Sequence, residues 1–222
     1  MPINSLIFDL DGTLIDSSDG VVEAVNYAFN QMGIASCPPE VIKPYIGYPL
    51  KEMFADLTPV SADLLYDHFQ VRARTSVVDS SVMLERVDPT LRELRERGYK
   101  MAIATTKIGV HVDAIIRKFG WEDLFDAAVA GNDVSRVKPH PESIHLAIAR
   151  LGATPDESMV IGDTENDVLA AQGVPTRAVA LLSLYGGHDR VTKLNPDFII
   201  SALPELIPIL DRLNAVRTSA VR

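Results

Sequence analysis

The chain has 222 residues, 47% of them hydrophobic, so it is long enough to bury a sizeable core in one domain or in a domain with an insert. Its formal net charge of -9 opposes binding to nucleic acid, and we find neither an apolar run that could span a bilayer nor a signal peptide, so we expect a cytoplasmic protein without nucleic-acid or membrane partners. The single cysteine, Cys37, has no second cysteine with which to form a disulfide or a thiolate metal site.

Short apolar runs that end in polar residues or glycine predict a parallel sheet. The first run, SLIFD at residues 5–9, is typical of a strand buried on both faces. Further strands are predicted at residues 101–105, 127–131, 158–163, 177–181 and 197–200. Helical patterns separate these runs. The alternation predicts a doubly wound α/β core.

The helices of this core are marked by caps and by apolar faces. One helix is predicted to begin with Asp88 as its N-cap and Pro89 as its first residue, and to end near Gly98. A second is marked by the face of Ile144, Ile148 and Leu151, and a last helix is expected from about Pro204.

Residues 16–85 interrupt the alternation, because they show helical periodicity and no strand pattern. Val21, Val25, Ala28 and Met32 share one helical face, and further helices are expected to begin near Pro39 and after Ser61. We therefore predict a helical domain at residues 16–85, inserted into a core formed by residues 1–15 and 86–222. Its hinges are expected at residues 16–18 and 80–86, so that it can open and close over the core.

Polar side chains suited to binding phosphate or a metal ion follow four of the predicted strands. The carboxyl ends of parallel strands meet at one edge of a sheet, where ligands of open α/β sheets bind. The residues are Asp9, Asp11, Thr105, Lys138, Asp163 and Asp167. Each alone has an ordinary structural explanation as a turn residue, a helix cap or a solvated loop charge. Together, carboxylates, a hydroxyl and an ammonium favour a site for a divalent cation and phosphate.

Four segments in this order, FDLDGTLIDS, IATTK, KPHP and IGDTEND, resemble the four motifs of the haloacid dehalogenase-like phosphatases, particularly the phosphoglycolate phosphatase branch. The resemblance covers essentially the whole chain, and residues 16–85 are similar to the helical cap of that branch. The chain departs from the pattern at Thr106, where relatives often carry Asn. We interpret His140, inside KPHP, as a loop histidine.

The resemblance implies a phosphatase that forms an aspartyl phosphate on Asp9, with Asp11 as the acid and base. It implies Mg²⁺ held by Asp9, the backbone carbonyl of Asp11 and Asp163, with Asp167 orienting these ligands. Phosphate would be held by Gly12, Thr13, Thr105, Thr106 and Lys138. A cation is needed because a phosphate charge about 4 Å from a carboxylate is repelled by roughly 4 kcal/mol at an effective dielectric constant of 20.

The segment YIGYPLK, residues 45–51, resembles the cap loop that selects the substrate in this family. We therefore expect Tyr45, Gly47, Tyr48 and Lys51 to face the substrate, with the Lys51 ammonium binding the anionic end of a short phosphate such as phosphoglycolate. The partner is a small phosphorylated metabolite, and pyrophosphate, a nucleotide or a sugar phosphate would meet the same core. The sequence leaves the number of subunits open.

Three other functions are compatible with parts of this pattern. A receiver-like signalling module also combines Asp, Thr and Lys around Mg²⁺, but DxDGT on the first strand and the helical insert favour a hydrolase. A dinucleotide-binding protein is disfavoured because no G-x-G-x-x-G follows the first strand. A phosphomutase similar to the β-phosphoglucomutases would share Asp9 and Asp11 but return phosphate to a sugar.

Overall fold

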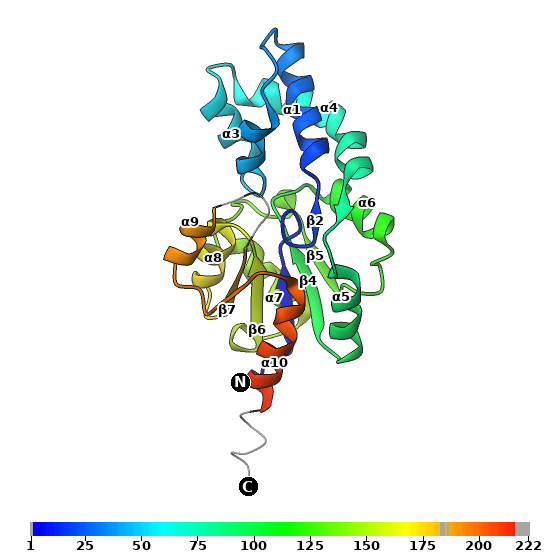
Figure 1. The fold of residues 1–222 in the computed structure, drawn as a ribbon, viewed down its shortest axis with the longest axis vertical. Helices are drawn as coiled ribbons and strands as arrows, with labels where there is room; N and C mark the ends of the chain where they lie inside the picture. The colour runs from blue at the N-terminus through cyan, green and yellow to red at the C-terminus, as the bar shows by residue number, and fades with distance from the viewer. Residues whose placement is uncertain (1, 183–184, 186, 216–222) are drawn as a thin grey trace.

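A computed structural model describes residues 2–182, 185 and 187–215 (Figure 1). Its centre is a parallel sheet with the strand order β5-β4-β1-β6-β7-β8. The strands are β1 (Ser5–Phe8), β4 (Lys100–Ala104), β5 (Ala127–Val129), β6 (Ser158–Gly162), β7 (Arg177–Leu181) and β8 (Phe198–Ile200). The doubly wound α/β core predicted from the alternating pattern is confirmed.

Strand β1 lies in the middle of the sheet and sets the register of its neighbours. Phe8, its last residue, is paired with Ile103 of β4 and with Ile161 of β6. Because the three strands run in parallel and in register, the residues that follow them meet at one edge of the sheet. Asp9, Thr105 and Asp163 are therefore brought to the same edge.

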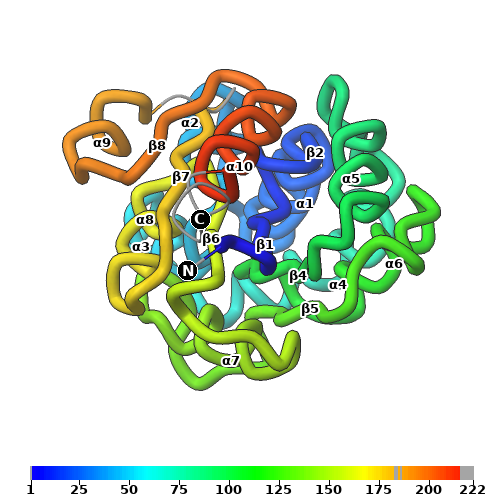
Figure 2. The backbone as a smooth tube through the Cα atoms, turned by 90° about the horizontal axis from the view of Figure 1, so that it is seen from below, coloured from blue at the N-terminus to red at the C-terminus, as the bar shows by residue number. Residues whose placement is uncertain are grey.

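Helices cover both faces of the sheet (Figure 2). On one face, α5 (Val87–Glu96), α6 (Gly109–Phe119) and α10 (Leu206–Ala215) pack with the side chains of Leu6 and Phe8. On the other, α7 (Glu142–Leu151) and α8 (Glu165–Gln172) pack with Ile7, and α9 (His188–Lys193) adds Val191. Successive residues of a strand point to opposite faces, so the apolar run of β1 supplies both layers. Single 3₁₀ turns lie at Lys43–Tyr45, Gly131–Asp133, Pro155–Glu157 and Leu203–Glu205.

A helical unit lies beyond the carboxyl ends of the strands, at the top of Figure 1. It consists of α1 (Ser18–Gln31), α2 (Pro39–Ile42), α3 (Leu50–Leu57) and α4 (Ala62–Ser80). We call these helices and their connections the cap. The cap has its own hydrophobic cluster, in which the rings of Phe29, Phe54 and Phe69 pack in sequence with centroids 6.1 and 6.2 Å apart. The cap and the sheet therefore have separate cores.

Two short strands connect the cap to the core, where the sequence pattern indicated no strand. Strand β2 (Ile15–Asp16) pairs in antiparallel fashion with β3 (Val82–Met83). Each strand has two residues, which is too short for an alternating pattern to be recognised. Both connections to the cap therefore run side by side.

The predicted start of helix α5 is two residues too late. The helix begins at Val87, after Arg86, which adopts a left-handed conformation with φ 61°. Asp88 lies inside the first turn, where its carboxylate accepts hydrogen bonds from Arg92 and Trp121. Those side-chain partners come from the folded chain, so the local Asp-Pro pattern misplaced the N-cap.

Among the described residues, we find no helix with the length and apolar character needed to cross a membrane.

Candidate active site

Asp9 and Lys138 form the centre of a buried polar cluster at the carboxyl edge of the sheet. The Lys138 ammonium lies 2.5 Å from Asp9 Oδ1 and donates to the backbone carbonyl of Ala104 at 2.9 Å. The Asp9 and Lys138 side chains are 3% and 2% exposed, so the ion pair is shielded from water. Burial lowers the pKa of Lys138, but Asp167 and Asp9 raise it by more, so this lysine is charged.

Asp167 fixes this lysine from the other side. One oxygen of its carboxylate accepts a second hydrogen bond from Lys138. The other accepts from the backbone N–H and hydroxyl of Thr164, at 3.0 and 2.6 Å. Thr164 is the N-cap of α8 and Asp167 its third residue, so the pair forms a capping box. The local helix start therefore holds Asp167 in place.

Asp163 lies against the turn that follows β1. Its Oδ1 accepts a hydrogen bond from the Thr13 hydroxyl at 3.0 Å. Gly12 adopts φ 84°, and a Cβ added there would lie 2.2 Å from Asp163 Oδ2. Only glycine permits this approach. In the DxDGT motif, Gly12 thus leaves room for the Asp163 carboxylate, and Thr13 donates a hydrogen bond to it.

The buried carboxylates fit a divalent cation. Asp9, Asp163 and Asp167 each offer an oxygen within 4.8 Å of the others. Asp9 Oδ2 is buried and has no hydrogen-bond partner among the described residues. The pKa of Asp9 is raised to about 7, mainly by burial, with Lys138 acting to lower the pKa and Asp167 to raise it. A cation beside this oxygen would offset the cost of burying the ionised form.

Asp11 is held by two residues to which the sequence analysis gave no role. The Ser17 hydroxyl donates to Asp11 Oδ1, and the Lys107 ammonium lies 3.1 Å from Oδ2. Lys107 and Asp11 are both 8% exposed. Lys107 is the last residue of the IATTK segment and follows Thr105 by two residues, so the second motif itself was the available signal. Ser17 is the last residue of the FDLDGTLIDS segment and follows β2, so the end of the first motif was the available signal.

Thr105 and Thr106 follow β4 and lie beside this cluster. Thr105 is buried, and its hydroxyl accepts a hydrogen bond from the backbone N–H of Lys107 at 3.2 Å. The Thr106 hydroxyl donates to the carbonyl of Gly47 at 3.4 Å, which joins the core to the cap. His140 is not part of the cluster, and its Nδ1 accepts from the backbone N–H of Glu142.

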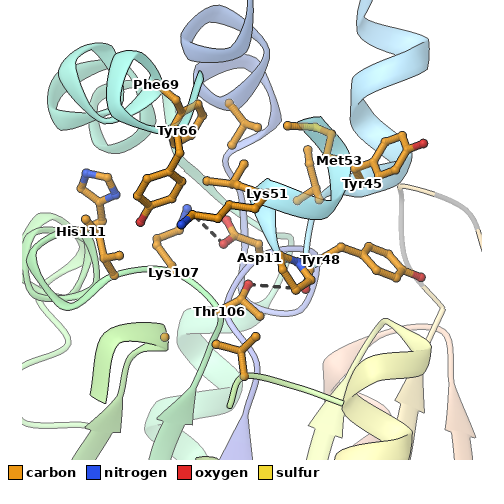
Figure 3. A pocket seen from close by; sticks show the side chains of 18 of the residues that line it. Asp11, Tyr45, Tyr48, Lys51, Met53, Tyr66, Phe69, Thr106, Lys107 and His111 are labelled. Atoms are coloured by element: carbon orange, nitrogen blue, oxygen red, sulfur yellow. Dashed lines mark hydrogen bonds and ion pairs between the residues drawn. The ribbon is translucent and has the colours of Figure 1, made fainter. Parts of the chain in front are cut away.

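The cap loop of residues 45–51 touches the core at Gly47. Gly47 adopts φ 91°, and a Cβ there would lie 2.8 Å from Thr164 Cγ2. The hydroxyl ends of Tyr45 and Tyr48 point away from Asp11 and Lys107 (Figure 3). Tyr45 donates to Asp56 at 3.3 Å, and burial and then Glu165 raise the pKa of Tyr48 well above its usual range. Gly47, rather than the two tyrosines, makes the close approach.

Lys51 is near the site but carries a partner of its own. Its ammonium lies 2.5 Å from Asp63 Oδ1 and 5.3 Å from the centre of the Tyr66 ring. The Lys51 side chain is 56% exposed. The expected contact between this ammonium and the substrate therefore stays a prediction that requires the pair with Asp63 to open.

A cavity of about 310 Å³ separates the cap from the core beside Asp11. Figure 3 shows Lys51 and Tyr66 on its cap side, and Lys107 and His111 on its core side. His111 is 4% exposed, and its Nε2 has no hydrogen-bond partner among the described residues. Burial and then Lys107 lower the pKa of His111 to about 4, so its imidazole is neutral at pH 7. No sequence motif pointed to this histidine.

Residues 6–181 match the family model of the haloacid dehalogenase-like hydrolases. A curated relative, the pyrophosphatase PpaX of Bacillus mycoides, is 30% identical over 217 residues, covering 96% of this chain and 100% of its own length. A haloacid dehalogenase-like family protein from Streptococcus pneumoniae superposes with a TM-score of 0.85 at 25% identity, covering 93% of this chain and 98% of that one. A predicted phosphoglycolate phosphatase from Haemophilus somnus superposes with a TM-score of 0.84 at 25% identity, covering 93% and 97%.

Proposed function

Since the chain belongs to the haloacid dehalogenase-like hydrolases and is a phosphatase, we propose that it hydrolyses a small phosphate monoester with the help of Mg²⁺, through an aspartyl phosphate on Asp9. One observation carries the proposal: Asp9 Oδ1 is held by Lys138, whereas the buried Oδ2 has no partner among the described residues. That oxygen is free to bind a cation or to attack phosphorus.

The cation site fits Mg²⁺ because its side-chain ligands are carboxylate oxygens. Asp9 and Asp163 would hold the ion together with the backbone carbonyl of Asp11. Asp167 would orient the site from its capping box and its bond to Lys138. When bound, the cation offsets the negative charge of the substrate phosphate and of the transferring group.

The two transfer steps follow from the residues around Asp9. Asp9 attacks phosphorus in line, the ester P–O bond breaks, and the leaving oxygen takes a proton from Asp11. Water then attacks the aspartyl phosphate, Asp11 accepts its proton, and inorganic phosphate leaves with Asp9 restored. Lys138, Thr105 and the backbone N–H of Thr106 would hold the phosphate oxygens during both steps.

The resemblance to phosphoglycolate phosphatases favours a short acidic ester, and a relative is named for pyrophosphate. Both are therefore substrates to test, together with p-nitrophenyl phosphate as a general probe. The β-phosphoglucomutase-like alternative differs in its acceptor, because it transfers phosphate to a sugar rather than to water.

The test compares the purified chain with Asp9→Asn, Asp163→Ala and, as a control, Asp113→Asn, which alters an exposed carboxylate on α6. We expect phosphate release from p-nitrophenyl phosphate to need Mg²⁺, to stop with EDTA, and to fall by at least about 10³-fold in Asp9→Asn. Asp163→Ala should raise the Mg²⁺ concentration for half activity and remove the stabilisation that Mg²⁺ gives against heat.

Asp113→Asn should match the parent chain in both measurements. Activity near the parent level in Asp9→Asn would contradict the nucleophile. An unchanged Mg²⁺ titration in Asp163→Ala would show that other groups bind the ion.

A further inference from the structure

The leaving group of the substrate must lie in the cavity beside Asp11. This statement rests on the proposed function, in which Asp11 hands a proton to the leaving oxygen. Asp11 and Thr106 line the cavity, whereas Asp9 and Lys138 do not. The phosphate therefore sits below the cavity, beside Asp9, and whatever is attached to the phosphate extends past Asp11 into it.

Apolar side chains form most of the wall that this leaving group would meet. Leu50 and Tyr66 of the cap and Ile108 and Val137 of the core line the cavity and are half-buried, so part of each side chain faces open space. Val21 and Ile46 extend the wall on the cap side. Water beside such a wall has few hydrogen-bond partners, and an apolar group that displaces it gains affinity.

The charged groups around the cavity are already paired. Lys107 is paired with Asp11, and Lys51 with Asp63. The His111 imidazole is neutral at pH 7, because burial and Lys107 lower its pKa. Among the described residues that line the cavity, these groups leave no free charge for a second anion. A two-carbon acid or pyrophosphate would have to separate one of these pairs and would leave the apolar wall uncovered.

We propose that the substrate is a phosphate monoester of an alcohol with an apolar body of several carbons, which packs between the cap wall at Leu50 and Tyr66 and the core wall at Ile108 and Val137. The volume of the cavity, about 310 Å³, lies at the lower end of the range for small-molecule sites. It has room for such an alcohol and exceeds what the two carbons of glycolate would fill, so the cavity favours this ester over the short acidic ester that the resemblance suggests.

The first test is a series of n-alkyl phosphates from ethyl to pentyl, assayed with Mg²⁺ beside phosphoglycolate, pyrophosphate and p-nitrophenyl phosphate. A buried methylene is worth about fourfold in affinity. We therefore expect kcat/KM to rise about fourfold per methylene, or roughly 60-fold from ethyl to pentyl phosphate, if each added carbon reaches the wall. Pentyl phosphate should also exceed phosphoglycolate and pyrophosphate.

The second test changes the wall. Ile108→Thr replaces an apolar surface by a hydroxyl at the N-cap of α6, a position where threonine suits the helix start. The pentyl-to-ethyl ratio of kcat/KM should fall by about fourfold or more. The matched control is Ile116→Thr, a half-buried isoleucine of the same helix that packs on the sheet core and lies outside the cavity wall, and it should keep the ratio.

A flat alkyl series, a ratio unchanged by Ile108→Thr, or a higher kcat/KM for phosphoglycolate or pyrophosphate than for pentyl phosphate would overturn this inference while leaving the phosphatase intact. Failure to hydrolyse every ester, p-nitrophenyl phosphate included, would instead overturn the proposed function, and the inference with it.

Discussion

Among single residues, Asp11 offers the sharpest test of chemistry, because both of its carboxylate oxygens have partners, Ser17 and Lys107. Asp11→Asn keeps the shape but carries no acidic proton for a leaving alkoxide. We expect kcat to fall by about 10²- to 10⁴-fold on an alkyl phosphate and much less on p-nitrophenyl phosphate, whose phenolate needs little protonation. Steady-state kinetics on both esters measure the difference. Equal losses would remove Asp11 from the acid role.

His111 makes stability depend on pH. Its pKa is lowered from the usual 6.5 to about 4, first by burial and then by Lys107. Between these values the unfolded chain binds a proton that the folded chain does not, so stability falls as pH drops from 6.5 towards 4. For this one group we expect the free energy of unfolding to fall by about 2 kcal/mol between pH 7 and pH 5.

Urea denaturation at both pH values checks this. His111→Gln should lose less stability than the parent chain over this interval. The control is His145→Gln, which alters an exposed histidine of α7 and should behave like the parent chain. If His111→Gln shows the same pH dependence as the parent, the imidazole is protonated in the folded state.

The sequence located Asp9, Asp163 and Lys138 at one site because each follows a predicted strand, and parallel strands bring such residues together. The partners of Asp11 were missed for a physical reason. Lys107 and Ser17 end the IATTK and FDLDGTLIDS segments, but only the folded chain brings their side chains to Asp11. His111 lies on the face of α6 that lines the cavity between the cap and the core, and no motif marks that face.

At the level of elements, the cap loop at residues 45–51 depends on glycine. Gly47→Ala puts a Cβ 2.8 Å from Thr164 Cγ2, whereas a Cβ at Gly33 would meet nothing within 4 Å. Both glycines have positive φ, so alanine carries backbone strain of about 1–3 kcal/mol at either position. Only Gly47→Ala should push the loop away from α8.

We expect kcat/KM to fall by about 10- to 100-fold in Gly47→Ala, because small displacements of groups at an active site are costly. Gly33→Ala should lose similar stability and keep its kcat/KM, which thermal denaturation and steady-state kinetics can separate. Similar kinetics in the two variants would mean that the close approach of Gly47 to Thr164 does not govern closure of the cap over the core.

Elements with a strong pattern could be predicted from the sequence, and those fixed by contacts could not. Strand β1 is apolar from Leu6 to Phe8 and buried on both faces, so its pattern alone identified it. Strands β2 and β3 exist because two connections run side by side, and neither connection shows this by itself. The start of α5 likewise depends on the left-handed Arg86, for which the sequence carries no glycine signal.

For the whole molecule, the relation between cap and core depends on contacts far apart in sequence. The Tyr185 hydroxyl of the core donates to Asp16 at 2.7 Å, at the base of the first connection to the cap. At the second connection, the Lys118 ammonium of α6 donates to the carbonyls of Val78, Asp79 and Ser81, at 2.7, 2.8 and 2.7 Å. These carbonyls lie at the end of α4, where the last backbone acceptors lack i+4 partners, although that of Val78 also accepts from the Ser81 N–H at 3.3 Å.

Lys118, a residue of the core, therefore binds the carboxyl end of α4 in the cap. Its positive charge also suits that end of the helix. Lys118→Met should free the end of α4 and speed hydrogen exchange of the amides at residues 78–82 by about tenfold, while the sheet amides keep their rates. The matched control is Arg117→Met, which removes the neighbouring charge from the last turn of α6. Unchanged exchange in Lys118→Met would show that Val78, packed against the sheet core, holds the connection without the lysine.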